Sequence, residues 1–145
     1  MYDIIFGIHV FVSSIFILLG FFILFRSIRS WISSRPYTRL DHLGSMGFLS
    51  LLYVQFFLGL MLYFFPGPAG RSGELSMEEA QHNYNLQFWV IEHFSIMIFA
   101  LFLSQVGRIF ISKSPTDLQK HQKVIFYFGI SLLLSLVSAG LGMMR

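Results

Sequence analysis

The side chains of this sequence that are able to ligate a metal are its histidines and carboxylates. There is no cysteine, so thiolate sites, iron–sulfur clusters and disulfides are excluded. His9 and His93 lie inside apolar runs, whereas His42 and His121 lie beside charged residues. A buried imidazole needs a partner for its polar nitrogens, because an unpaired polar group in hydrocarbon costs several kcal/mol. His9 and His93 are therefore the candidate site residues.

The elements that must position these histidines are membrane-spanning helices. The chain has 145 residues, of which 55% are hydrophobic and 12% charged, and its mean hydropathy is +0.69. A hydrocarbon core about 30 Å thick needs roughly 20 apolar residues of helix, and four segments are long enough. We expect one all-α membrane domain, residues 1–145, built as an up-down-up-down four-helix bundle. The predicted spans are residues 4–25, 43–65, 86–107 and 124–143.

Basic residues predict the orientation of these spans. Two connections are basic, with Arg26, Arg29, Arg35 and Arg39 in the first and Arg108, Lys113, Lys120 and Lys123 in the third. The second connection has one Arg and three Glu. Cytoplasmic loops carry an excess of Lys and Arg, so we expect both termini outside and the two basic connections inside. Positive charge follows the first span instead of preceding it, so we expect this span to be retained and not cleaved as a signal peptide.

Each span has one face of small or polar residues that suits the interior of a bundle. These faces are His9, Ser13, Phe16 and Gly20 in the first span; Gly44, Gly47, Leu51, Gln55 and Gly59 in the second; His93, Met97, Ala100, Ser104 and Gly107 in the third; and Phe128, Ser131, Ser135, Ser138 and Gly142 in the fourth. Capping-box patterns precede three helices, at Thr38–Asp41, Ser76–Glu79 and Ser114–Asp117.

The depths of His9 and His93 match. At 1.5 Å per residue, His9 is roughly 8 Å and His93 roughly 10 Å below the outer boundary. A b-type haem needs two neutral imidazoles on different helices at one depth, in a cavity with small walls. We therefore predict His9 and His93 as axial ligands of a haem b. The alternative is that each histidine is an interhelical hydrogen-bond donor without a ligand.

A second haem between His42 and His121, at the inner ends of the second and fourth spans, is the less favoured alternative. His42 follows Arg39 and Asp41, and His121 lies between Lys120 and Lys123, which favours solvated interfacial side chains. Glu92, beside His93, is a candidate proton-handling group or a plain interfacial carboxylate.

Several short motifs resemble the small four-span bacterial membrane proteins labelled cytochrome b or cytochrome b-like. They are the early His9, the run from Arg35 to Asp41, the run from Gln55 to Phe64, and Ile91-Glu92-His93. The resemblance implies a membrane haem protein, carried over onto His9 and His93. The family often has a His two positions before the glutamine of the second span, where this chain has Tyr53, so no ligand from that span is implied.

These observations lead to a predicted function and one main alternative. We expect an electron-transfer protein of a bacterial cytoplasmic (inner) membrane, within or beside a respiratory chain, that exchanges electrons with a quinone or a redox partner. The alternative is a haem-free accessory subunit of a larger membrane complex, and an independent enzyme is less favoured than either. A small proton or metal transporter is disfavoured because the span centres have almost no ionisable residues. Lipid and other membrane subunits, or further copies of the chain, are the expected partners. Nucleic acid is not expected, since the net charge is only +3 and the basic residues form no stripe.

Overall fold

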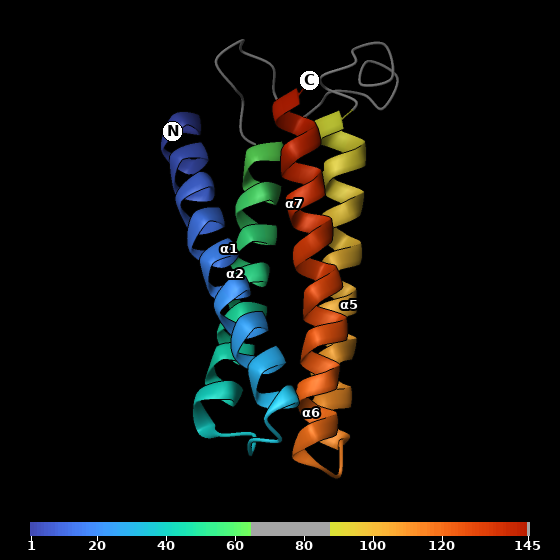
Figure 1. Ribbon diagram of the computed structural model, residues 1–145. Coiled ribbons are helices and arrows are strands. Elements are labelled where there is room, and N and C mark those ends of the chain that lie inside the picture. Colours follow the sequence, from blue (N-terminus) through green and yellow to red (C-terminus); the bar gives the residue numbers. More distant parts are fainter. Residues whose placement is uncertain (65–87, 145) are drawn as a thin grey trace.

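The computed structural model describes residues 1–64 and 88–144, and over these two ranges the protein is helical with no strand (Figure 1). The helices are α1 (Tyr2–Ile32), α2 (Arg39–Phe64), α5 (Phe94–Lys113), α6 (Asp117–Lys123) and α7 (Gly129–Met144). A π-helical turn, η1 (Phe88–His93), leads into α5, and a second, η2 (Val124–Phe128), joins α6 to α7. The predicted cap at Ser76–Glu79 lies outside the described residues.

Among the described residues, four helical rods are long and apolar enough to cross a membrane, judged by length and composition. They are Tyr2–Ile32, Arg39–Phe64, Ile91–Lys113 and Asp117–Met144. Over the described residues, the first, second and fourth predicted spans fall within these rods, whereas the third prediction begins before its rod, which starts at Ile91. All four rods continue beyond the predictions at the end that carries the basic residues. Hydropathy marks the part suited to hydrocarbon, whereas backbone hydrogen bonding continues into the polar turns beyond it.

Helix α1 ends in a turn at Ser33–Arg35. Ser34 has a left-handed backbone with φ of 51°. The N–H of Ser34 donates to the carbonyl oxygen of Trp31 at 3.3 Å, and the N–H of Arg35 donates to that of Ser30 at 2.8 Å. This pair of bonds is a Schellman motif, which satisfies the last carbonyls of α1 and turns the chain toward α2.

Both termini lie at one end of the bundle, and the connections 33–38 and 114–116 lie at the other (Figure 1). α1 packs against α2 and against the rod formed by α6, η2 and α7. α5 packs against α2 and against the same rod. α1 and α5 therefore occupy opposite corners of the bundle, with α2 and α7 as shared neighbours.

The core is formed by bulky side chains midway along the rods. The ring of Phe48 lies 4.6 Å from that of Phe16 and 5.0 Å from that of Phe128, between centroids. The rest of the buried core cluster consists of Ile23, Leu52, Ile111, Val124 and Leu132. In α2 the buried face therefore also includes bulky apolar residues, with Phe48, Leu49 and Leu52 between the predicted Gly44 and Gln55. Gly47 and Leu51, also predicted for this face, are only partly buried.

Small residues form the contact between α5 and the fourth rod, as predicted for these two spans. Ser104 and Ser131 are fully buried, and Ser104 Oγ donates to Ser131 Oγ at 2.7 Å. Ser131 Oγ is in turn within donating distance of the Ala100 carbonyl oxygen at 3.1 Å. Gly107 is also buried in this contact. These residues let the two backbones approach closely and satisfy the hydroxyl groups in hydrocarbon.

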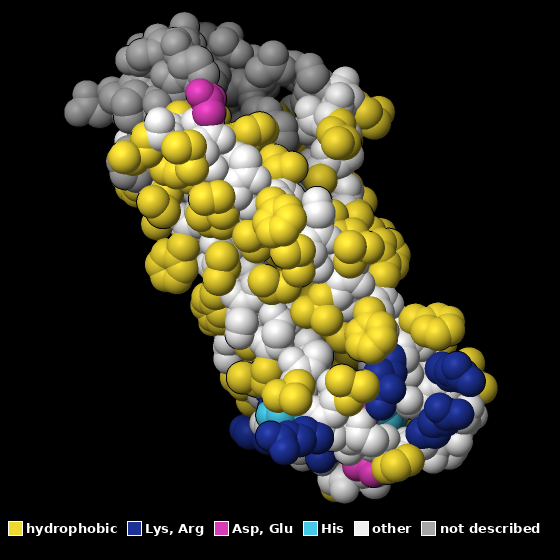
Figure 2. Space-filling model, turned by 90° about the vertical axis from the view of Figure 1, so that its left-hand side faces the viewer, with side chains coloured by type: hydrophobic (Ala, Val, Ile, Leu, Met, Phe, Trp, Pro, Cys, Tyr) yellow, Lys and Arg dark blue, Asp and Glu magenta, His cyan; other side chains and the backbone are white. Residues whose placement is uncertain are grey.

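Apolar side chains cover most of the lateral face shown in Figure 2, and Lys and Arg gather at the end of the bundle with the 33–38 and 114–116 connections. Large side chains such as Phe11, Leu18 and Phe25 are 65–70% exposed. A soluble protein rarely exposes so large a continuous apolar surface, whereas a lipid-facing surface has this character.

The basic end is tied together by Arg26, Thr38 and Asp41. Arg26 Nε donates to Asp41 Oδ1 at 2.7 Å, and the N–H of Thr38 donates to Asp41 Oδ2 at 2.9 Å. The predicted capping residues at the start of α2 are therefore in contact, with the carboxylate also bound by α1. The prediction that Ser114 caps the helix that became α6 is wrong. Thr116 is the N-cap and accepts from the N–H of Gln119 at 3.3 Å, because Ser114 Oγ instead donates to the Phe110 carbonyl oxygen of α5.

We expect Asp41→Asn to lower the free energy of unfolding by about 2 kcal/mol, because it weakens hydrogen bonds to a charged group whose side chain is 3% exposed. Titration of the detergent-solubilised protein with SDS, followed by circular dichroism, measures this change. Asp117→Asn is the control, since Asp117 is exposed in the first turn of α6, and we expect a smaller loss. Equal losses in the two variants would contradict the assigned role of Asp41.

Candidate functional site

The structure brings His9 and His93 to one cavity of about 80 Å³ inside the bundle. All four rods contribute to its wall. The polar side chains on the wall are His9, Ser13, Gln55, His93 and Ser135. The others are Phe16, Ile17, Leu52, Phe56, Gly59, Phe94, Met97 and Ala139. The cavity adjoins the core at Phe16 and Leu52, on the side away from the basic end.

His93 is the last residue of η1, and its ring is held by the fourth rod. His93 Nδ1 and the hydroxyl of the fully buried Ser138 are 2.7 Å apart. π-helical turns occur mostly as single turns within α-helices and are frequent at functional sites. The periodicity of the sequence predicts the inward face of this span but not the π-helical turn that sets the position of His93. A metal at this ring would bind through Nε2, because Ser138 engages Nδ1.

His9 faces the cavity from α1. Its Nδ1 atom is buried and has no hydrogen-bond partner within the described part of the chain. Gly59 of α2 lies close to this ring, since a Cβ placed on Gly59 would be 3.8 Å from His9 Cε1. A larger side chain at position 59 would therefore compete with the imidazole for space.

Gln55 is the site residue whose role the sequence does not reveal. Its Nε2 atom donates to the His9 carbonyl oxygen at 3.1 Å and also to Ser13 Oγ. Ser13 Oγ donates to the same His9 carbonyl oxygen at 2.8 Å. The signal in the sequence is a single amide on the inward face of an apolar span, which indicates burial but not a partner.

Position 53 does not belong to this site. Tyr53 is exposed, and its hydroxyl donates to Gln105 Oε1 of α5 at 2.8 Å. The tyrosine that replaces a frequent histidine of the resembling family therefore lies outside the cavity wall.

His42 and His121 are held in separate contacts at the basic end. His42 is exposed, and its Nδ1 accepts from Arg108 Nη2 at 2.9 Å. His121 is fully buried, with Nε2 donating to the Arg35 carbonyl oxygen at 3.1 Å and its ring 5.4 Å from that of Tyr37. The prediction of a solvated side chain is correct for His42 and wrong for His121, because the 33–38 connection folds over the start of α6.

Tyr37, which covers His121, is itself partly buried. Burial raises the pKa of its hydroxyl above the ordinary value, so this group is neutral at physiological pH. The hydroxyl lies 3.1 Å from Ser45 Oγ. These contacts give His121 a packing role at the junction of the helices.

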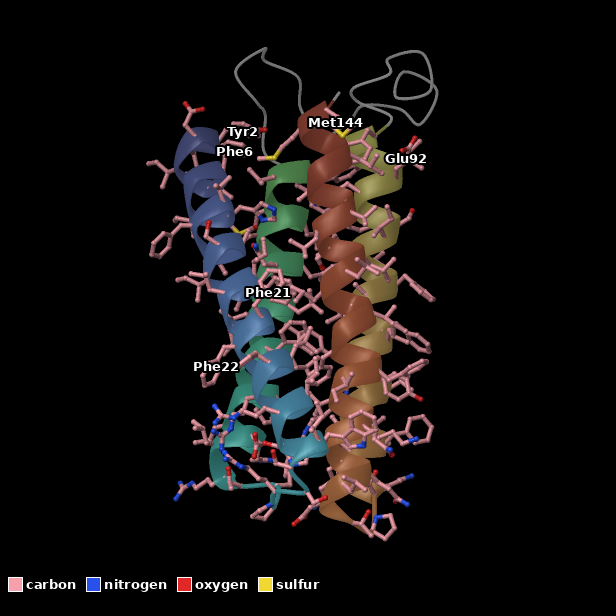
Figure 3. The ribbon with its side chains drawn as sticks, viewed as in Figure 1. Tyr2, Phe6, Phe21, Phe22, Glu92 and Met144 are labelled. Atoms are coloured by element: carbon pink, nitrogen blue, oxygen red, sulfur yellow. The ribbon has the colours of Figure 1, made fainter. Side chains whose placement is uncertain are left out.

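Glu92, the candidate proton-handling group, lies at the end of the bundle that carries the termini and points away from the helices (Figure 3). It is partly exposed and does not line the cavity. The structure therefore does not connect Glu92 with the two imidazoles.

The donor set of the cavity fits a haem iron, whereas its present volume does not accommodate the macrocycle. Two imidazoles from different rods and a mainly apolar wall suit bis-histidine ligation. A cavity of about 80 Å³ holds several water molecules, while pockets for drug-sized ligands are roughly 300–1,000 Å³. Phe56, Phe94 and Met97 on its wall are only partly buried. Within the described ranges no three His, Asp or Glu side chains cluster in a way that could hold a metal ion, so a site built from protein ligands alone is not found there.

Over residues 1–64 and 88–144, fold and site together define a class: a helical protein with four helices that are long and apolar enough to span a membrane and a histidine-lined cavity between them. Comparison with models of known protein families, with curated proteins and with solved structures finds no significant match to this chain.

Proposed function

We propose that this protein is a membrane electron carrier that binds one b-type haem between His9 of α1 and His93 of η1. The observation that carries the proposal is that one cavity is lined by two imidazoles from opposite corners of the bundle. In a haem complex, one nitrogen of each imidazole, His9 and His93, would bind the iron. Hydrogen bonding within the protein can then satisfy the other nitrogen, as Ser138 already does for His93.

The orientation that goes with this proposal is an up-down-up-down bundle in the bacterial cytoplasmic membrane with both termini outside. The gathering of Lys and Arg at the opposite end supports it (Figure 2). The cavity then lies in the outer half of the bilayer, and a quinone or a redox protein outside the cytoplasm would be the exchange partner.

The residues of this chain would hold and insulate the cofactor. A bound haem would supply reversible one-electron chemistry at its iron. Ser138 holds the ring of His93 through Nδ1, so Nε2 would be the atom that ligates the iron. Phe16 and Leu52 close the cavity toward the core, and both are at most 2% exposed. Phe56, Phe94 and Met97 line the same cavity and are only partly buried, so a bound haem would displace these side chains.

A second function, that of a haem-free accessory subunit, is favoured by one observation. The cavity has a volume of about 80 Å³, which suits water and is small for a haem. The extensive apolar lateral surface would then contact other subunits as well as lipid.

An absorption spectrum of the detergent-purified protein after dithionite reduction separates the two functions. We expect a Soret band and the α-band of a low-spin bis-histidine b-type haem, with one haem per chain by the pyridine haemochrome assay. A protein expressed with sufficient haem supply that shows no Soret band would overturn the electron-carrier proposal and leave the accessory function.

A further inference from the structure

The contacts of Gln55 fix the orientation of its amide. The His9 carbonyl oxygen is an acceptor only, so the group that bonds to it must be the NH₂ of Gln55. The hydroxyl of Ser13 donates to the same carbonyl oxygen, and its oxygen accepts a hydrogen bond from the second N–H of Gln55. Both protons of the amide are therefore used, and Oε1 is directed elsewhere as an acceptor.

Two complementary polar atoms beside the cavity then have no hydrogen-bond partner among residues 1–64 and 88–144. Gln55 Oε1 and His9 Nδ1 are both buried and orphaned, and both residues line the cavity wall. A buried acceptor or donor left unsatisfied is costly. The cavity has room for water, and a water between polar groups satisfies both.

We propose that Gln55 is a positioning residue for His9 and acts through a water molecule in the cavity. The water accepts a hydrogen bond from Nδ1–H of His9 and donates one to Oε1 of Gln55. The amide thus ties the backbone of His9 to α2 and also selects its tautomer. With Nδ1 protonated, the lone pair is on Nε2. The consequence for ligation rests on the proposed function, since a haem iron would then bind this nitrogen.

The test of the hydrogen bond needs no haem. We expect ¹⁵N NMR of the full-length, histidine-labelled protein in detergent, expressed under haem limitation, to show His9 mainly as the Nδ1–H tautomer. His9→Ala identifies its signals. Gln55→Met, of similar size but without the acceptor, should lower the ratio of Nδ1–H to Nε2–H tautomer about fivefold, the effect of one ordinary hydrogen bond. Gln105→Met is the matched control, because Gln105 bonds Tyr53 away from the cavity.

A wild-type His9 in the Nε2–H form, or a ratio unchanged by Gln55→Met, would overturn the inference. The wild-type measurement decides it even if Gln55→Met does not fold. In the haem-loaded protein, Gln55→Met should also weaken haem binding by about 10- to 100-fold, as loss of a ligand's hydrogen-bond partner does. If the wild type takes up no haem, the proposed function fails while the tautomer measurement still tests the role of Gln55.

Discussion

Replacing either His9 or His93 by alanine is expected to lower the haem content per chain by more than about tenfold. Loss of a ligand's outer hydrogen-bond partner already costs 10- to 100-fold in metal affinity, and loss of the ligand itself removes the bond to iron. The two residues lie on different rods but on one cavity, so either deletion leaves an iron with one protein ligand. The pyridine haemochrome assay on purified protein measures the change.

The matched control for these variants is His42→Ala. His42 is an exposed histidine at the basic end that contacts Arg108, and its loss should leave haem content unchanged. A further check is His93→Gly with imidazole added to the buffer, since the free ligand can replace the missing ring and restore the low-spin spectrum. Wild-type haem content in both His9→Ala and His93→Ala would show that these imidazoles are not the ligands.

Gly107→Ala is expected to lower the free energy of unfolding by about 2–3 kcal/mol. A Cβ on Gly107 would overlap Cβ of Tyr127 and lie 2.8 Å from its Cγ. Overpacking of this kind costs about 1–3 kcal/mol, and separation of the two rods would also weaken the nearby bond between Ser104 and Ser131. SDS titration followed by circular dichroism measures the loss.

Gly140→Ala is the control for this prediction, because a Cβ there would meet nothing within 4 Å. We expect no loss of stability in this variant, and alanine is the better helix former by about 1 kcal/mol. Combining Gly107→Ala with Tyr127→Gly removes the overlapping atom, so the double variant should lose less than the sum of the single losses. Additive losses would show that the overlap with Tyr127 is not the cause of the stability loss in Gly107→Ala.

Part of the site follows from sequence patterns alone. The inward faces of the third and fourth spans follow from spacing, and Ala100, Ser104 and Ser131 are buried as predicted. The same faces place His9 and His93 inside the bundle. In the second span the spacing is less informative, because Phe48 and Leu52 occupy the core between the small residues. Bulky apolar side chains suit both lipid and core, so periodicity in a span does not distinguish the two.

What the sequence determined by itself is what depends on local composition: four apolar rods, a basic end opposite the termini, and histidines within the first and third rods. The tertiary structure decided the contacts between residues far apart in the chain. Only the packed bundle pairs Gln55 with the backbone of His9, gives His93 its Ser138 partner and buries His121 beneath Tyr37. The physical reason is that hydropathy and helical spacing fix which face turns inward, whereas a hydrogen bond between helices depends on their relative rotation and height, which packing sets.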